Sequence, residues 1–499
     1  MRPSLSDFLL VSLVVWLFVA GSGWENLLAD GDTGWHIRTG EYILDTRSVP
    51  THDLFSFSKP GEPWFAWEWL ADVIFALLHR QWGLAGVVAF CGITVCVAAL
   101  VLFRHMLWRG ANVLVALPVT FLCAGASSIH FLARPHVFTL LLLAGSLWLV
   151  ERDRRRAGGC IWWLVPLTAL WTNLHGGFLA LPACLAAMAA GTALESGWRA
   201  GRRYVGLVVA CGAASLVNPY GIRLHLHVAG YLRSDWIRQA VDEFQSPRFR
   251  SESLFQFEML LVAGLLVTGT LLARRRFAEA LLVLLWAHLA LVSVRHVPLF
   301  VIAAGPVVAL EAAWLWDKCA SSRSPKSVAG VLAALARDLT PGFRRNTVWA
   351  PVFVATAVWL TPGAKWPADF PAAKFPAAML RAHPELRDGA RVFASDEWGD
   401  YLIYRGWPRA RVFIDGRSDF YGERIGKDYL RLIEGREGWR NLLDRHGIDV
   451  VLVPPDGALA QLLAGAESWR ESARDRRAVV FLRVGFLPPA PNQTPPLLR

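Results

Sequence analysis

Apolar runs near the length of a bilayer crossing recur along this chain, and they constrain its fold more than any other feature. Of the 499 residues, 54% are hydrophobic and only 18% are charged, a balance that soluble domains rarely show. The runs therefore predict an α-helical multi-pass membrane protein. We expect about eleven transmembrane helices, at residues 8–23, 84–103, 111–127, 134–150, 160–176, 178–195, 204–217, 254–273, 277–294, 297–316 and 347–361.

Basic residues gather in short clusters between these apolar runs. If the N-terminus is cytoplasmic and the amphipathic stretch from Trp67 to Trp82 lies flat in the interface, every cluster falls on the cytoplasmic side, as the positive-inside rule requires. This orientation places the C-terminal region outside the cytoplasm. We expect the protein to lie in the inner (plasma) membrane. The net charge of +11 is then explained by the basic clusters that fix the orientation in the membrane, and we expect no nucleic acid partner. A cleaved signal peptide is the alternative for the first segment.

The chain after the last apolar run is polar enough to form a soluble domain. We divide the sequence into a membrane domain (1–361) with a first extracytoplasmic loop and interfacial helices (24–83), a Pro- and Ala-rich linker (362–388), a small soluble α/β domain (389–487) and a disordered tail (488–499). The patterns predict strands at 390–394, 410–414, 448–453 and 478–484, and helices at 397–405, 423–446 and 457–464.

The first outer loop carries acidic and imidazole side chains among tryptophans. Asp30 and Asp32, separated by one glycine, could hold a divalent cation such as Mg²⁺ or Mn²⁺, or one of them could act as a general base. The same Asp-Gly sequence is also ordinary turn chemistry. His36, His52, Asp53 and Glu68 are further candidates for substrate contact, against the alternatives of capping, loop hydrogen bonds and interfacial anchoring.

Polar residues also mark the outer ends of several predicted spans. The candidates for substrate binding are Arg134, His136, Asn173, His175, Arg295 and His296. An arginine in such a place can pair with a phosphate or pyrophosphate, although arginines also extend toward lipid headgroups and amides often serve helix packing.

Two acidic motifs follow predicted strands in the soluble domain, one from Asp396 to Asp400 and one from Asp415 to Asp419. Sites in α/β folds lie at the ends of strands. Ordinary strand–helix turn chemistry explains these motifs equally well.

The overall pattern of the chain resembles the GT-C superfamily of membrane glycosyltransferases. The pattern consists of an acidic motif in the first outer loop, interfacial helices before the second span, many spans and a soluble C-terminal domain. Protein O-mannosyltransferases, aminoarabinose transferases and oligosaccharyltransferase subunits belong to this superfamily. The resemblance implies an inverting transfer of a sugar from a polyprenyl-phosphate donor to a glycan, lipid or protein acceptor on the non-cytoplasmic face. It implies Asp30 or Asp32 as base or metal ligand, and it would bring the phosphate near Arg134 and Arg295. Many members have adjacent acidic residues, whereas Gly31 intervenes here.

Two other functions fit a chain of this class. A transporter or flippase of a lipid-linked or anionic substrate would place ionisable residues near the membrane midplane and often contains inverted repeats. Here these residues lie at span ends and the sequence shows no repeat. A non-catalytic membrane assembly protein is the third hypothesis.

Overall fold

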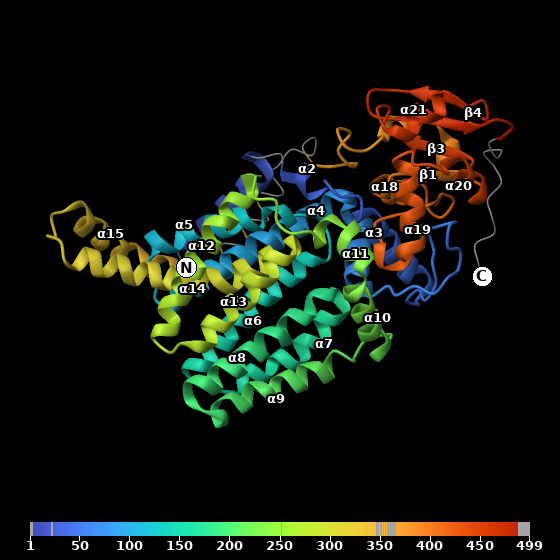
Figure 1. The fold of residues 1–499 in the computed structure, drawn as a ribbon. Coiled ribbons are helices and arrows are strands. Elements are labelled where there is room, and N and C mark those ends of the chain that lie inside the picture. The colour runs from blue at the N-terminus through green and yellow to red at the C-terminus, as the bar shows by residue number, and fades with distance from the viewer. Residues whose placement is uncertain are drawn as a thin grey trace.

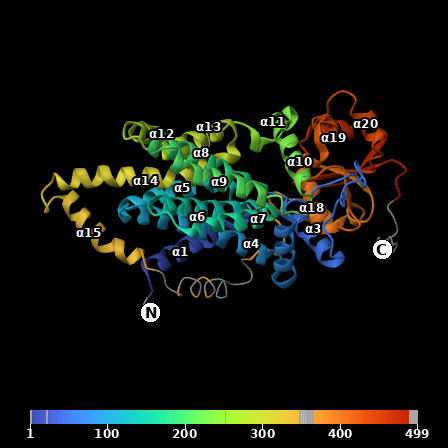
Figure 2. The same cartoon turned by 90° about the horizontal axis from the view of Figure 1, so that it is seen from below.

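The computed structural model describes residues 3–20, 23–250, 252–345 and 366–487, and four isolated positions, 349, 352, 354 and 356. Helices form an elongated bundle with the C-terminal domain at one end. The N-terminus and α15 (Val328–Phe343) lie toward the other end (Figure 1, Figure 2). The predicted span 347–361, apart from the four isolated positions, and the predicted tail 488–499 lie outside the described residues.

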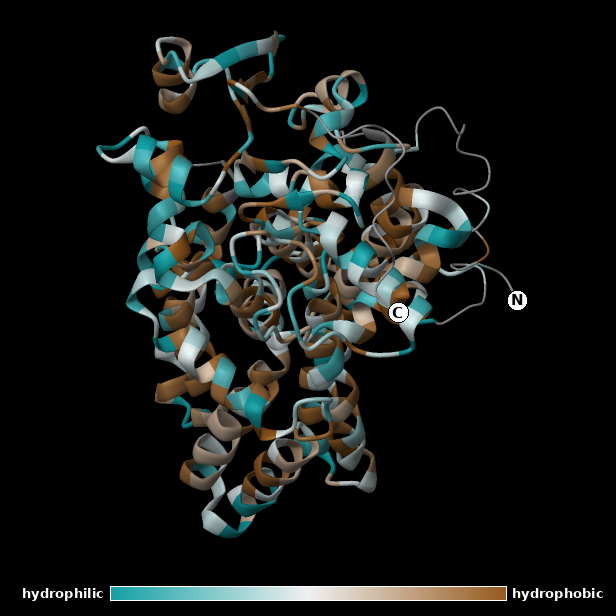
Figure 3. Ribbon diagram, turned by 90° about the vertical axis from the view of Figure 1, so that its right-hand side faces the viewer, coloured by the Kyte–Doolittle hydropathy of each residue, from teal (hydrophilic) through white to brown (hydrophobic). Residues whose placement is uncertain are grey.

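A helix forms at each of the other ten predicted spans. These helices are α1 (Leu5–Val15), α4 (Trp69–Arg109), α5 (Val113–Ser127), α6 (His136–Arg155), α7 (Leu164–Leu174), α8 (Ala180–Ser196), α9 (Trp198–Ala214), α12 (Glu252–Ala273), α13 (Phe277–Val292) and α14 (Val297–Ser321). Hydrophobic residues, drawn in brown, recur on the helices of the molecule between hydrophilic stretches (Figure 3). Within the described part of the chain, five helical segments are long and apolar enough to cross a membrane, and two shorter apolar helices accompany them. The number of crossings therefore stays a prediction.

Arginines that the sequence assigns to the cytoplasmic side pair with glutamates inside the bundle. Arg109, the last residue of α4, lies 2.8 Å from the Glu279 carboxylate of α13, and Arg154 of α6 lies 2.8 Å from Glu195 of α8. Since these side chains are largely buried, pairing is required to offset the cost of taking the charges out of water. The pairs hold four helices together.

The helix α4 is interrupted at Gly83. A straight helix of its 41 residues would be about 60 Å long, roughly twice the thickness of a bilayer core. The backbone of Gly83 is left-handed, with φ 64° and ψ −162°, a conformation that glycine adopts without steric cost. The segment before this break, from Trp69, is thus a helical piece separate from the apolar one that follows. Its location in the membrane interface stays a prediction.

Short elements connect the bundle to the C-terminal domain. The first outer loop contains α2 (Gly23–Leu27) and α3 (Thr33–Thr46), and α3 packs against both α4 and α18 (Asp396–Gly406). The connection between α9 and α12 contains α10 (Ile222–Arg233), α11 (Asp235–Ala240) and the 3₁₀ turn η5 (Asp242–Phe244), none of which the sequence predicted. α11 packs against α19 (Ser418–Ile433) of the C-terminal domain (Figure 1).

The C-terminal domain is built on a five-stranded mixed sheet. The strands β1 (Arg391–Ala394), β2 (Arg411–Val412), β3 (Val450–Val453), β4 (Trp469–Arg474) and β5 (Val479–Arg483) lie in the order β2-β1-β3-β5-β4. β1 is parallel to β2 and β3, whereas β5 is antiparallel to β3 and β4. Around the sheet lie α17 (Ala377–Ala382), η8 (Pro384–Leu386), α18, α19, α20 (Trp439–Arg445) and α21 (Ala458–Ala464).

The four predicted strands and the helices near 397–405 and 457–464 are confirmed. The single helix predicted at 423–446 is wrong, because Gly435 and Gly438 adopt positive φ angles and divide α19 from α20. The sequence missed β4, an edge strand whose side chains are mostly exposed and polar. The predicted linker is partly helical, and its Phe370 and Phe375 are buried against Tyr401 of the domain.

Candidate functional site

A cavity of about 830 Å³ lies between the bundle and the C-terminal domain, within the size range of ligand sites in proteins. One side of its wall is formed by the first outer loop, the start of α6, the segment around His175, the α10–η5 connection and the start of α14. Residues between Asp396 and Leu430 of the C-terminal domain form the other. The cavity therefore joins segments that are distant in the sequence.

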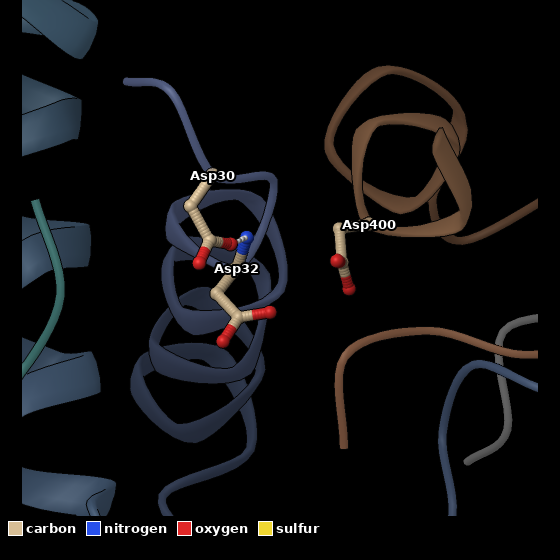
Figure 4. Close-up of side chains that lie close together, drawn as sticks. All are labelled: Asp30, Asp32 and Asp400. Atoms are coloured by element: carbon tan, nitrogen blue, oxygen red, sulfur yellow. Dashed lines mark hydrogen bonds between the residues drawn. The ribbon is translucent and has the colours of Figure 1, made fainter. Parts of the chain in front are cut away.

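Three carboxylates converge on this cavity. Asp30 and Asp32 immediately precede α3, and Asp400 faces them from α18 (Figure 4). One oxygen of each lies within 4.8 Å of the others. Steric contact explains why a glycine separates Asp30 from Asp32. A Cβ on Gly31 would lie 2.4 Å from the carbonyl oxygen of Glu397 and 2.7 Å from the Cβ of Asp400. Only glycine lets this turn approach α18 so closely.

Arg134, just before α6, is held by three carboxylates. Its guanidinium lies 2.8 Å from Asp30, 2.7 Å from Asp32 and 2.9 Å from Glu243 of η5. The sequence predicted Arg134 as a cation for a phosphate, and the structure shows a cation that binds acidic residues of two separate loops. Planar guanidinium geometry suits this multiple pairing.

Burial and mutual repulsion shift the titration of these acids. Burial raises the pKa of Asp32 to about 7, although the Arg134 guanidinium acts in the opposite direction. Burial, followed by the neighbouring Asp32 and Asp415 carboxylates, raises the pKa of Asp400 well above its usual range. Burial also acts to raise the pKa of Glu243, but Arg134 and Arg295 outweigh it and hold that pKa well below its usual value. At Asp32 burial therefore outweighs the attraction of Arg134, whereas at Asp400 burial and carboxylate repulsion act in the same direction.

Arg295, in the 3₁₀ turn η6 (Val294–His296), also lines the cavity. Its guanidinium lies over the Phe244 ring, 4.5 Å from the centroid. Within the described ranges it has no carboxylate at ion-pair distance. His296 and His136 line the same wall, and their ring nitrogens contact the carbonyl oxygens of Leu289 and His130.

Glu68 contributes a second acidic region of the wall. Its carboxylate lies 3.6 Å from Nε2 of His36 and 3.4 Å from Nε2 of His175. His36 lies behind Glu68, outside the cavity wall, and its Nδ1 is 2.6 Å from Asp72.

Like His36, three other predicted residues do not line the cavity. His52 is exposed and contacts Thr51. Asp53 accepts hydrogen bonds from the backbone of Phe55 and Ser56 and from Arg417. The Asn173 amide bonds with Trp69, Ala169 and Val217. The contacts of Asp53 and Asn173 are therefore the loop and packing hydrogen bonds that the sequence offered as alternatives. A substrate role for His52, Asp53 and Asn173 stays a prediction.

Sequence reasoning missed several residues of the wall. Asp400 belongs to a strand-end motif that the sequence singled out, but turn chemistry explained that motif equally well. Asp72 lies within the amphipathic stretch assigned to the interface, and Glu243 lies in a connection for which no element was predicted. No local pattern marks Glu243 as a partner of Arg134.

The three converging carboxylates fit a divalent cation. Carboxylate oxygens are the ligands that Mg²⁺ and Mn²⁺ prefer, and Asp400 has no arginine or lysine at ion-pair distance among the described residues. Glycine is required beside the cluster, because a Cβ on Gly416 would lie 1.9 Å from Oδ1 of Asp32 and 3.2 Å from Oδ2 of Asp400. Asp30, Asp32 and Asp400 are therefore the residues that would hold the ion.

No protein-family model and no curated protein matches this chain. Similarity appears in solved structures of the oligosaccharyltransferase of Archaeoglobus fulgidus. The form tethered with an acceptor peptide containing the NVT sequon has a TM-score of 0.57 at 14% identity, covering 90% of this chain and 68% of that one. The form in complex with an inhibitory peptide and a dolichol-phosphate has a TM-score of 0.57 at 12% identity, covering 90% and 69%.

These likenesses concern the fold. Together with the apolar helices, they identify an integral membrane protein with a helical bundle and a small C-terminal sheet. The chain therefore shares its fold with the Archaeoglobus fulgidus oligosaccharyltransferase, and the resemblance seen in the sequence is confirmed at the level of the fold.

Proposed function

We propose that this protein is an inverting glycosyltransferase that moves a sugar from a polyprenyl-phosphate-linked donor to an acceptor outside the cytoplasm. It would act in the inner (plasma) membrane, with its N-terminus cytoplasmic and its C-terminal domain outside. The observation that carries the proposal is the convergence of Asp30, Asp32 and Asp400 beside Arg134 in one cavity at the end of the bundle. The oligosaccharyltransferase that shares the fold has been crystallised with an acceptor peptide and with a dolichol-phosphate, which supports both substrate classes.

The cavity has two chemically different sides, and each suits one substrate. Arg295 lines the cavity on the side of the bundle, which also carries the apolar residues Leu179, Trp286 and Leu299. A cation in such surroundings can neutralise the phosphate that leaves with the lipid, because electrostatic stabilisation is strongest where water is excluded. The converging carboxylates lie where the first outer loop meets the C-terminal domain. These would orient the nucleophilic group of the acceptor.

In the transfer step, the acceptor attacks the anomeric carbon of the sugar. The bond from that carbon to the phosphate oxygen breaks, and the polyprenyl phosphate leaves with the electron pair. When bound, a divalent cation would supply positive charge to polarise the groups held at Asp30, Asp32 and Asp400. Arg134 keeps the first two carboxylates in place through its ion pairs.

The test uses membranes that contain the full-length protein and a series of polyprenyl-phosphate donors labelled in the sugar, either hexose or pentose. We expect label to move from the lipid fraction to an acceptor fraction. Asp30→Asn and Asp32→Asn should reduce this transfer about 100-fold, the usual effect of removing a preorganised electrostatic contact. Asp45→Asn is the matched control, because Asp45 lies in α3, the helix that follows Asp30 and Asp32, but is exposed and paired with Arg80.

Full transfer in both aspartate variants would contradict the assignment of the site. Label that crosses the membrane while still attached to its lipid would indicate a flippase instead. Absence of transfer from every donor in wild-type membranes would contradict the glycosyltransferase proposal as a whole.

A further inference from the structure

Glu68 has an unusual environment for a residue at the start of a helix. It occupies the N-cap of α4, yet its side chain makes no capping hydrogen bond. A carboxylate at this position normally accepts a bond from the first turn. Here it lies between two imidazole rings, with its side chain 12% exposed, and lines the cavity.

The hydrogen bonds of His175 determine which of its nitrogens carries the proton. The backbone N–H of Gly177 donates to Nδ1 at 3.0 Å. Trp171 donates through Nε1 to the Thr139 hydroxyl, whose own proton is then available for the same Nδ1 at 2.8 Å. Because Nδ1 accepts, the proton of the neutral ring lies on Nε2. His175 therefore presents an N–H toward Glu68.

His36 presents the opposite group. Its Nδ1 lies 2.6 Å from an Asp72 carboxylate oxygen. We assign Nδ1 as the donor in this contact, which requires Asp72 to be ionised against the upward shift that burial gives its pKa. In the neutral ring Nε2 then carries a lone pair. That lone pair faces Glu68 at 3.6 Å. One oxygen of Glu68 thus faces a donor and the other a proton acceptor.

We propose, resting on the glycosyltransferase function above, that Glu68 is the catalytic base that removes the proton of the acceptor group and holds it facing His36. As the acceptor attacks the anomeric carbon, its proton passes to a Glu68 carboxylate oxygen. The proton stays on Glu68, which then donates toward the Nε2 lone pair of His36. Asp72 and His175 act as positioning residues, since Asp72 holds the His36 ring and His175 faces the other Glu68 oxygen.

This assignment separates two tasks in the cavity. The oxygens of Asp30 and Asp32 are engaged by Arg134, and one Asp30 oxygen also accepts the backbone N–H of Asp32. They are suited to hold and orient. Glu68, by contrast, has no arginine or lysine at ion-pair distance within the part of the chain that the structure describes.

The electrostatics of Glu68 agree with a proton-accepting role. Burial raises its pKa to about 8, opposed by Arg134 and Arg295 and assisted by Asp32 and Asp419. Burial lowers the pKa of His36 well below its usual value, so the ring stays neutral and can accept a hydrogen bond from protonated Glu68. Since the base must be ionised, transfer should increase as the pH rises through about 8.

Two variants test the proposal in nanodiscs containing the full chain, with a labelled polyprenyl-phosphate sugar as probe. Glu68→Gln keeps the shape of the side chain and its contacts with both imidazole rings but cannot accept a proton. It should reduce the transfer rate about 100-fold or more and abolish the increase with pH, while the KM for the donor stays unchanged. Asp72→Asn should reverse the tautomer of His36 and present an N–H to Glu68, lowering the rate about 10-fold. Glu62→Gln is the control, because Glu62 lies in the same loop, is half-exposed and pairs with Lys59.

Infrared difference spectroscopy of the same samples measures the proton on Glu68 directly. A protonated-carboxyl band that disappears at alkaline pH should be present in the wild type, absent in Glu68→Gln and shifted in Asp72→Asn. The proposal is overturned if no such band exists or if Glu68→Gln transfers sugar with an unchanged pH profile. A wild-type chain that shows the band and transfers no sugar contradicts the proposed function and with it the role of Glu68 as base.

Discussion

The Arg417 guanidinium of the C-terminal domain donates a 2.8 Å hydrogen bond to the Asp53 carboxylate of the first outer loop. Both side chains are almost completely buried, and Arg417 also pairs with Asp415 at 2.6 Å. The guanidinium lies 4.5 Å from the centroid of the Trp64 ring, a cation–π contact that strengthens in the absence of water. This ion pair is a direct polar connection between the loop that carries Asp30 and the domain that carries Asp400.

Arg417→Leu should loosen this connection, because it leaves two buried carboxylates without their cation. Breaking a buried ion pair on one side costs about 3–5 kcal/mol. We expect denaturant unfolding in detergent to occur at lower concentration and proteases to cleave the first loop faster. Arg424→Leu, an exposed position of the same helix, is the control. Equal stability of the two variants would show that other contacts, not the Arg417–Asp53 ion pair, hold the C-terminal domain against the first loop.

The sequence was a good guide to the elements and a poor guide to their partners. Apolar runs predicted ten helices because length and hydrophobicity are local properties. The strands around Phe393 and Val451 were found for the same reason, since β-branched and aromatic residues alternate with turn signals. The edge strand near Trp469 escaped because its exposed side chains lack an apolar pattern.

The site shows the limit of local patterns. Asp30, Asp32 and Arg134 were singled out from their position beside apolar runs, and the structure brings them together. Their meeting with Asp400 spans more than half of the chain and depends on docking of the C-terminal domain. Glu243 was invisible for a related reason, because its connection has no periodic pattern. Asp53 was recognised as polar and well placed, but its contacts are with Arg417 rather than with the cavity.

Arg134→Gln should reduce sugar transfer strongly while it lowers the stability of the fold only slightly. The change leaves Asp30, Asp32 and Glu243 facing one another without a cation, so their mutual repulsion should separate the two outer loops that they occupy. We expect sugar transfer to fall about 100- to 1000-fold. Arg134→Lys should not restore it, since an ammonium cannot make the planar, multiple contacts of a guanidinium. Near-normal transfer in the lysine variant would contradict this geometric role.

Gly416→Ala should block the space between the converging carboxylates. The new methyl group would lie 1.9 Å from Oδ1 of Asp32, far inside van der Waals contact, so the carboxylate must turn away. We expect loss of transfer, and weaker Mn²⁺ binding measured by paramagnetic resonance. Gly465→Ala is the control, because the nearest atom to its added Cβ is 4.0 Å away. Unchanged Mn²⁺ affinity in Gly416→Ala would argue against an ion between these residues.

Glu68→Gln should make the protein more stable at alkaline pH while it removes activity. Burial raises the pKa of Glu68 from 4.5 to about 8, so the folded chain binds this proton more tightly than the unfolded chain does. The stability that this proton contributes is complete below about pH 4.5 and is lost as the pH rises through about 8. Glutamine cannot ionise, and its amide can donate toward His36 and accept from His175 as the protonated acid does. We therefore expect the melting temperature of the wild type to fall between pH 6 and pH 9, roughly across the titration of this carboxyl, and that of Glu68→Gln to fall less. Parallel decreases in the two proteins would mean that Glu68 is already ionised in the fold at pH 6.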